Sequence, residues 1–536
     1  MNIMQYIIIY GFIYTLALLI LTRKHEAKTV TSTQRSRLSS KCDVVLAIII
    51  GLVILIMPVA LYTISNYHSF PNPDTYFYIV SSYIDNWSAM PVNEYYKSFP
   101  IYVILIKSLS LITGIERTLA IMVIHLSALC LLFIGIVILL EYLGRKTHTT
   151  SRTIFLISPI FISSIYFYSY LNIMIPQTFS LWIIIFLFIV LLNSKRNILL
   201  VVLLSILGLV HVSTLPFLFI VLLMSFVLGW IISKMYINGK NATPFLGNKS
   251  MLLSTVILII TYSLYIIYAY RVAGLETYMH YYIDILHRIL YQPEDLVSIF
   301  IGTAPYGGIT RQYPFISALG PAFIVAVFIV GLYLIIFKKL LPHPLILGMM
   351  IFGVISLSIG FTRYYIAIDI PSASIARYMN VYGFLFLVIY DIYVIHQITM
   401  RYNSKVMYFV IISMALVGMT GSLFDPITIP YKQSHSDVLF ARTLSSFIES
   451  YSTIYFESVE LYYYLGPQIS FWKFQDKAVN INSVYIKDVL TIRDVPPFSY
   501  NVIIDNMIFA MGFNVVYIHG SLETNPILII GLNPSR

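Results

Sequence analysis

The chain is divided by long apolar runs that recur along most of its length, and these runs constrain the fold more than any other feature. A helix of about 20 apolar residues spans the hydrocarbon core of a bilayer. Because no water binds the backbone there, each run must satisfy its own backbone hydrogen bonds as a helix. Charged residues make up only 10% of the chain, whereas soluble domains carry about 25%. The sequence therefore predicts an all-α polytopic membrane protein.

We expect about 12 transmembrane helices, each placed by asking for a spanning apolar run. They are Ile3–Leu21, Asp43–Ile64, Thr118–Leu143, Thr153–Leu171, Thr178–Leu192, Ile198–Val210, Phe217–Ser233, Met251–Tyr270, Ile316–Phe337, Leu345–Thr362, Val381–Ile398 and Val406–Phe424. The first run has no small-residue cleavage site after it, so we expect a permanent helix and not a signal peptide.

Basic residues in the short loops predict the orientation of these helices. The densest basic loop follows the first run and contains Arg23, Lys24, Lys28, Arg35, Arg37 and Lys41. Cytoplasmic loops are enriched in Lys and Arg, so we expect a multi-pass protein of the cell membrane with its N-terminus outside. The Lys and Arg residues of the short loops between the apolar runs also account for the net charge of +10. That charge therefore reflects topology, and no nucleic-acid partner is expected.

One short run decides the topology. Ile101–Ile112 is apolar, contains Lys107 and is too short to span easily. Counted as a span, it would place several later basic loops outside. Runs of about 10–14 residues more often lie in the interface or re-enter the membrane. We therefore expect a helix lying in the interface, within the first large external loop.

Three regions follow from this arrangement. Residues 1–42 form an extra N-terminal helix with its basic cytoplasmic loop. Residues 43–424 form the transmembrane core, with external loops at 65–117, 271–315 and 363–380. Residues 425–536 form an extracytoplasmic α/β domain. Its expected elements are a helix at Asp437–Ser450 and strands at Thr453–Val459, Ser483–Ile486, Val502–Ile504 and Val515–Ile518.

The residues that could perform chemistry gather in the external loops. Asp74 lies in the first loop, in the run Pro73-Asp74-Thr75. A carboxylate at the edge of a low-dielectric bundle can have a raised pKa and act as a general base. The alternative is that Asp74 forms an Asx-type turn after Pro73.

Three cations could bind a lipid phosphate. Lys97 stands at the start of the interfacial run, where it could bind phosphate or reach anionic headgroups as an interfacial lysine. Arg363 and Arg377 flank the third loop. A guanidinium group matches phosphate oxygens bidentately, although either arginine could equally close a helix end or pair with Asp369.

Further polar residues in the loops are candidates for a second shell or for an acceptor. They are Asp85 and Glu94 in the first loop and His280 and Asp284 in the second. His280, Asp284 and His287 would share one helix face and could hold a metal, but such residues more often form a solvated face. We therefore assign no metal site. Cys42 and Cys130 belong to no CxxC pair or Cys/His cluster.

The order of these features resembles that of the GT-C glycosyltransferases. An external loop with an acidic residue leads to Lys97-Ser98-Phe99-Pro100 and a short helix that ends in Thr113-Gly114-Ile115-Glu116. Ser158-Pro159 follows in an outward span, and Ala376-Arg377-Tyr378 precedes a late span. The resemblance covers roughly Asp43–Phe424 and is greatest to the prokaryotic and archaeal branch near protein mannosyltransferases and aminoarabinose transferases. Heavy use of isoleucine and tyrosine also suggests an archaeal source.

The resemblance implies a transferase that uses a polyprenyl-phosphate sugar of the dolichyl-phosphate type as donor. It implies an inverting displacement on the extracytoplasmic face, with a glycan, lipid or protein as acceptor. Carried over by position, Asp74 would be the base, and Lys97 with Arg363 or Arg377 would hold the donor phosphate. No cofactor is certain, and a divalent cation such as Mg or Mn could take part.

Departures from the family pattern leave a rival open. The first loop has no Asp-x-Asp or Glu-x-Asp pair, and the second outer turn, around Asn172 and Gln177, has no carboxylate. The alternative function is a transporter, flippase or polymerase of lipid-linked glycans. A transporter would be expected to show midplane polar residues or broken helices in paired halves, and the sequence shows no duplicated halves.

Overall fold

The structure is a computed structural model that describes a subset of the chain. The described residues are 3–26, 41–65, 75, 78–79, 81–82, 100–144, 151–164, 171–192, 197–211, 214–235, 260, 264, 313–338, 340, 342–366, 370–402, 405–424, 453–456, 470–472, 483–488, 514–521 and 525–532.

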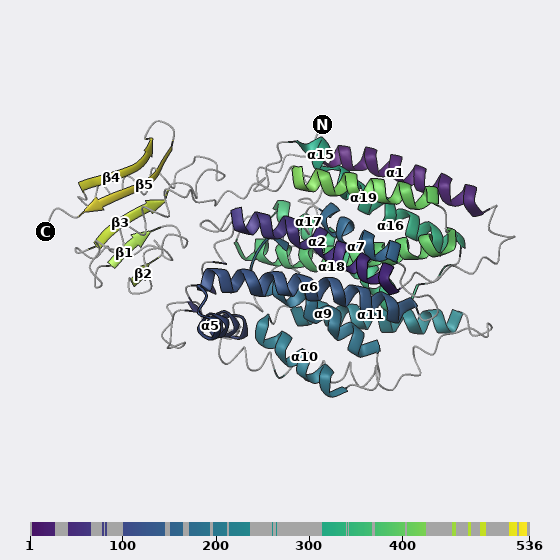
Figure 1. Cartoon of the computed structure of the whole chain (residues 1–536), viewed down its shortest axis with the longest axis horizontal. Helices are drawn as coiled ribbons and strands as arrows, with labels where there is room; N and C mark the ends of the chain where they lie inside the picture. Colours follow the sequence, from purple (N-terminus) through teal and green to yellow (C-terminus); the bar gives the residue numbers. More distant parts are fainter. Residues whose placement is uncertain are drawn as a thin grey trace.

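In the described part of residues 1–424, all the regular elements are helices, as expected (Figure 1). The helices are α1 (Ile3–Glu26), α2 (Lys41–Ser65), α5 (Ile101–Thr113), α6 (Arg117–Gly144), α7 (Ser151–Ser163), α9 (Pro176–Leu192), α10 (Asn197–Val210), α11 (Thr214–Met235), α15 (Pro314–Ser317), α16 (Leu319–Lys338), α17 (Pro344–Ile366), α18 (Ile370–Tyr402) and α19 (Lys405–Phe424).

The helices identify a polytopic membrane protein. Among the described residues, 6 helices are long and apolar enough to cross a membrane. They lie at Gln5–Arg23, Cys42–Leu61, Arg117–Leu143, Phe315–Lys338, Val381–Met400 and Lys405–Phe424. Several other expected spans coincide with shorter helices, and Met251–Tyr270 lies outside the described residues. The total of about 12 spans therefore stays a prediction.

Helix α18 is the centre of the bundle. In its spanning segment 94% of the residues are buried, whereas only 22% are buried in the corresponding segments of α1 and α2. α18 packs against α17, α16 and α7, and α1 covers α16. The exposed apolar side chains of α1 and α2 suit contact with lipid, because lipid tails are as apolar as the side chains themselves. The helix that contains Arg377 is thus the one most enclosed by protein.

The third expected loop is shorter than predicted. We expected an external loop at 363–380, but α17 continues to Ile366 and α18 begins at Ile370. Pro371 lies in the first turn of α18, where a proline costs no hydrogen bond. Arg363 and Arg377 therefore belong to helices and not to a loop.

Helix α5 crosses one end of the bundle, which supports the interfacial interpretation. Figure 1 shows α5 end-on, whereas α1, α6 and α19 run across the view. Its 13 residues would span only about 20 Å at 1.5 Å per residue. Gly114 ends the helix in the left-handed region, with φ 72°, and its N–H donates to the Ser110 carbonyl at 2.8 Å. This cap turns the chain directly into α6, so α6 begins at the same end.

The tail contains a mixed five-stranded sheet, drawn beyond the α5 end of the helices in Figure 1. Its strands are β1 (Thr453–Phe456), β2 (Ser470–Trp472), β3 (Ser483–Asp488), β4 (Asn514–Ser521) and β5 (Asn525–Leu532). Their order is β2-β1-β3-β5-β4. β1 pairs in parallel with β2 and β3, whereas β5 pairs antiparallel with β3 and β4.

Three of these strands, β1, β3 and β4, coincide with expected strands. Two others, β2 and β5, were not expected from the sequence. The expected strand at Val502–Ile504 and the expected helix at Asp437–Ser450 lie outside the described residues. Parallel neighbours need a crossover connection, which is consistent with an α/β arrangement of the tail.

Candidate functional site

The side chains of the predicted site lie outside the described residues. This holds for the expected base, the expected phosphate ligands and the secondary candidates, namely Asp74, Lys97, Asp85, Glu94, His280, Asp284 and His287. The backbones of Arg363 and Arg377 are described as helical, but their side chains are not. The site is therefore built from the described residues that border these positions.

The segment directly after Asp74 is helical and buried. Its described residues include Thr75, Tyr78, Ile79 and Ser82, which follow the i, i+3, i+4, i+7 spacing of one helix face. Each is less than 10% exposed. This buried face fixes the start of the segment against the bundle, so Asp74 adjoins a rigid element of the fold.

Thr75 connects this segment to the turn before α9. Its Oγ1 donates to the Met174 carbonyl oxygen at 3.3 Å. Residues 171–175 form an irregular stretch that is buried throughout. In a membrane protein such backbone persists only where protein or a water-filled cavity surrounds it. Thr75, the neighbour of Asp74 in sequence, thus contacts a buried, non-helical stretch just before α9.

His125 holds the other end of that stretch. It lies on α6, is completely buried, and its Nε2–H donates to the Leu171 carbonyl oxygen at 2.6 Å. Because the carbonyl can only accept, this contact places the proton on Nε2 in the neutral ring. Its Nδ1 has no hydrogen-bond partner among the described residues.

Aromatic rings join the first loop, α5 and α9. Tyr78 meets Tyr102 of α5 edge-on at 5.5 Å between ring centroids, and Tyr102 lies 5.5 Å from Phe179 of α9. Tyr102 is fully buried, and its hydroxyl has no partner among the described residues. Burial raises the pKa of Tyr102 well above its usual value of 10, so the phenol stays neutral.

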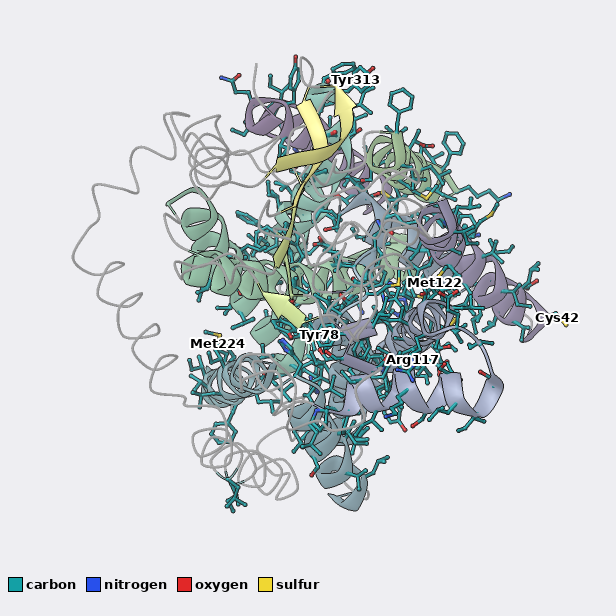
Figure 2. All side chains as sticks on the ribbon, turned by 90° about the vertical axis from the view of Figure 1, so that its left-hand side faces the viewer. Cys42, Tyr78, Arg117, Met122, Met224 and Tyr313 are labelled. Atoms are coloured by element: carbon teal, nitrogen blue, oxygen red, sulfur yellow. The ribbon has the colours of Figure 1, made fainter. Side chains whose placement is uncertain are left out.

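A further contact ties the first loop to the start of α6. Arg117 Nη1 donates to Ser82 Oγ at 3.5 Å, and the Ser82 hydroxyl donates to the Ile79 carbonyl at 2.6 Å. Figure 2 looks onto this end of the bundle and places Arg117 and Tyr78 beside α5, which runs lengthwise across the view. The first loop is therefore anchored to α5, α6 and the start of α9.

The first part of α18 is connected to the same end through α10. α10 packs against α9, and His211, just after α10, has its Nδ1 3.4 Å from the Tyr382 hydroxyl of α18. Arg377 precedes Tyr382 by five residues, about 7 Å along a helix. The helix of Arg377 and the neighbour of Asp74 are thus connected through α9 and α10.

A second polar group lies deeper in α18. Asp391 and His396 are completely buried. Among the described residues, neither carboxylate oxygen of Asp391 has a partner, nor does His396 Nε2. His396 Nδ1 lies 3.2 Å from Thr153 Oγ1 of α7. The structure therefore encloses Asp391 in protein.

No protein-family model and no curated protein sequence matches the chain. The chain is similar to the crystal structure of ArnT from Cupriavidus metallidurans in the apo state. The TM-score is 0.39 and the sequence identity 11%, covering 92% of this chain and 97% of that chain. This likeness is too distant to assign a family, so the proposals below stand on the sequence and the described contacts.

Sequence reasoning did not single out His125, Tyr102 or His396, and it used Gln177 only to mark a missing carboxylate. A polar residue inside an apolar run was the available signal, because such residues are costly in a membrane and are usually functional. Among the described residues, no group of three or more His, Cys, Asp or Glu side chains could hold a metal ion.

Proposed function

We propose that this protein is a membrane glycosyltransferase of the GT-C type. It moves a sugar from a polyprenyl-phosphate donor to a glycan, lipid or protein acceptor on the extracytoplasmic face. The observation that carries the proposal is the Thr75–Met174 hydrogen bond. It ties the residue next to Asp74 to the end of the bundle across which α5 lies, where a membrane-embedded donor can present its phosphate and sugar.

The reaction needs a base and an anion site. The acceptor hydroxyl oxygen attacks the anomeric carbon from the side opposite the phosphate and inverts its configuration. The bond between the anomeric carbon and the phosphate oxygen breaks, and polyprenyl phosphate leaves with the electron pair. The Asp74 carboxylate takes the acceptor proton, the role of a positioned general base. Lys97 and one of Arg363 or Arg377 hold the negative phosphate.

The positions of Arg363 and Arg377 in the helices favour one of them as the ligand of the donor phosphate. Arg377 lies on α18, the most enclosed helix, and five residues from Tyr382, which contacts the end of α10. Arg363 lies near the C-terminal end of α17, which packs along α18. We favour Arg377 as the phosphate ligand, because its helix connects to the α5 end through Tyr382 and His211 and a guanidinium group matches phosphate oxygens bidentately.

Other parts of the chain have proposed supporting roles. Asp85, Glu94, His280 and Asp284 would contact the acceptor or support the site, with a divalent cation such as Mg or Mn if one is needed. The extracytoplasmic tail, residues 425–536, would select the acceptor or brace the bundle. In this topology the N-terminus and the tail lie outside the cell membrane.

One buried residue favours a second candidate function, transport of a lipid-linked glycan. Asp391 is an ionisable residue inside a spanning helix with no partner among the described residues. Such residues often mark transport pathways. In this reading the protein would carry the lipid-linked sugar across the bilayer without breaking the bond between sugar and phosphate.

Reconstitution in liposomes separates the two functions. Purified protein is given a polyprenyl-phosphate sugar radiolabelled in the sugar, and the products are extracted. A transferase forms labelled acceptor and unlabelled polyprenyl phosphate, and Asp391→Asn retains that activity. Movement of intact donor between leaflets without cleavage, abolished in Asp391→Asn, would establish the transporter and contradict the transferase.

A further inference from the structure

Gln177 is a buried amide without a side-chain hydrogen-bond partner among the described residues. It is the second residue of α9 and only 2% exposed. Neither its side-chain nitrogen nor its side-chain oxygen has a hydrogen-bond partner among the described residues. The large majority of buried polar side-chain atoms are hydrogen-bonded. Gln177 lies at the α5 end of the bundle, and both polar atoms of its amide lack a partner among the described residues. It is therefore a candidate to bind a ligand.

The position of Gln177 is set by the turn that anchors the first loop. Met174, three residues earlier, accepts the hydrogen bond from Thr75. Pro176 opens the helix at the first position, where a proline is favoured. Gln177 is therefore one short turn from the contact that holds the neighbour of Asp74.

The face of α9 that contains Gln177 points toward α18. Gln177, Leu181, Ile184 and Phe188 follow a helical spacing, and all are nearly or completely buried. Phe188 packs against Phe386 of α18 at 6.0 Å between ring centroids. Both helices begin at the α5 end of the bundle (Figure 1). Gln177 thus lies at the outer end of the face that α9 turns toward the helix of Arg377.

The chemistry of a primary amide narrows the ligand. It is neutral, donates two hydrogen bonds and accepts two. A phosphate would be matched better by a cation, and an isoprenoid chain would leave the amide unpaired. Neighbouring hydroxyl groups of a sugar both donate and accept, so they match an amide. Tyr102 also has an unpartnered hydroxyl, but its ring packs against Phe179, on another face of α9.

We propose that Gln177 binds hydroxyl groups of the transferred sugar and so determines which sugar the enzyme accepts. The proposal rests on the transferase function and deepens it. Gln177 would act as a specificity residue and not as a base, because an amide does not take up a proton near neutral pH. Its buried amide has no partner in the described part of the chain, and a ligand hydroxyl would remove the cost of that unpaired state.

The first test is the stability of Gln177→Met, which keeps the size of the side chain and removes its polar atoms. If the amide is unpaired without ligand, this variant unfolds at the same or a higher temperature than wild type. Donor should raise the unfolding temperature of wild type by mass action and raise that of Gln177→Met much less. A variant that unfolds earlier and still gains the full shift with donor would overturn the proposal.

The second test is selectivity between two donors that differ at one hydroxyl, polyprenyl-phosphate mannose and polyprenyl-phosphate glucose. A site that hydrogen-bonds a substrate hydroxyl strongly rejects the analogue that misplaces it. We expect the ratio of the two kcat/KM values to change by about tenfold or more in Gln177→Met. Gln177→Asn, which keeps the amide but shortens the side chain, should change the ratio less.

The matched control is Ser180→Ala in the same turn of α9. Ser180 is also completely buried, but its hydroxyl already donates to the backbone carbonyl oxygen of Gln177 at 2.6 Å. This variant should leave the selectivity ratio unchanged. An equal loss for both donors in Gln177→Met would assign the residue a structural role and reject the inference while the transferase stands. No transfer by wild type from either donor would instead reject the transferase, and the inference with it.

Discussion

His125 on α6 donates from Nε2 to the carbonyl oxygen of Leu171 at 2.6 Å, across 46 residues of sequence. Three residues further along, Met174 accepts a hydrogen bond from Thr75. The two donors hold an irregular backbone stretch between them, and one of them adjoins Asp74. A histidine two turns inside α6 therefore helps to hold the stretch that Thr75, the residue after the expected base, contacts.

Two substitutions of His125 should distinguish the stability that comes from its hydrogen bond from the stability that comes from its packing. His125→Leu leaves the buried Leu171 carbonyl unpaired, which costs about 1–3 kcal/mol. His125→Gln can place an amide N–H near the position of Nε2 and should retain most of the stability. Chemical denaturation in detergent measures both variants. Equal destabilisation by Leu and Gln would show that packing, and not the hydrogen bond, accounts for this residue.

Gly320 on α16 should not tolerate a side chain. A Cβ there would collide with the backbone carbonyl of Ser163, the last residue of α7. Gly320→Ala should therefore destabilise the bundle by about 1–3 kcal/mol, the usual cost of overpacking. The control is Gly11→Ala on α1, where the nearest atoms lie 3.7 and 3.8 Å away. If both variants unfold like wild type, the close approach of α7 and α16 is wrong.

A native cysteine reports the orientation. Cys42 is exposed at the start of α2, the end expected to face the cytoplasm. In a Cys130→Ser background, a membrane-impermeant thiol reagent should label Cys42 only after the cells are permeabilised. Thr113→Cys, exposed at the end of α5, should be labelled in intact cells. Labelling of Cys42 in intact cells would reverse the topology and remove Asp74 from the outer face.

The donor phosphate should depend on Arg377. A hydrogen bond to a charged group contributes about 1.5–3 kcal/mol, so Arg377→Ala should raise KM for the donor by about tenfold to a hundredfold. Arg377→Lys should recover part of this, since lysine keeps the charge but loses the bidentate geometry. Arg401→Ala, at the opposite end of α18, serves as the control. An unchanged KM in Arg377→Ala would shift the role to Arg363.

The sequence was most informative where apolar length decides the structure. The brevity of Ile101–Ile112 predicted a short helix lying in the membrane interface. The structure has a 13-residue helix there, α5 (Ile101–Thr113), and its place in the interface stays a prediction. The sequence was less informative about residues 363–380, which were expected to form an external loop. α17 continues to Ile366 and α18 begins at Ile370, and Pro371 in the first turn of α18 is compatible with the helix.

The candidate site could be predicted only in outline. The sequence drew attention to Asp74 and the arginines because charged residues are scarce in this chain. It could not show that Thr75 reaches Met174 or that His125 reaches Leu171, because these contacts join segments about 100 and 46 residues apart. Nor could it distinguish the unpaired amide of Gln177 from a paired one, since pairing depends on tertiary neighbours.

The most direct test of the account is sugar transfer from a panel of polyprenyl-phosphate sugars by purified wild type and Asp74→Asn. Asparagine keeps the shape and the turn-forming capacity of aspartate but cannot take up the acceptor proton. We predict turnover by wild type with at least one donor and a loss of about a hundredfold or more in Asp74→Asn, with Glu141→Gln, at the far end of α6, close to wild type. Turnover that survives in Asp74→Asn, or a folded wild type that binds donor and never cleaves it, would contradict the account.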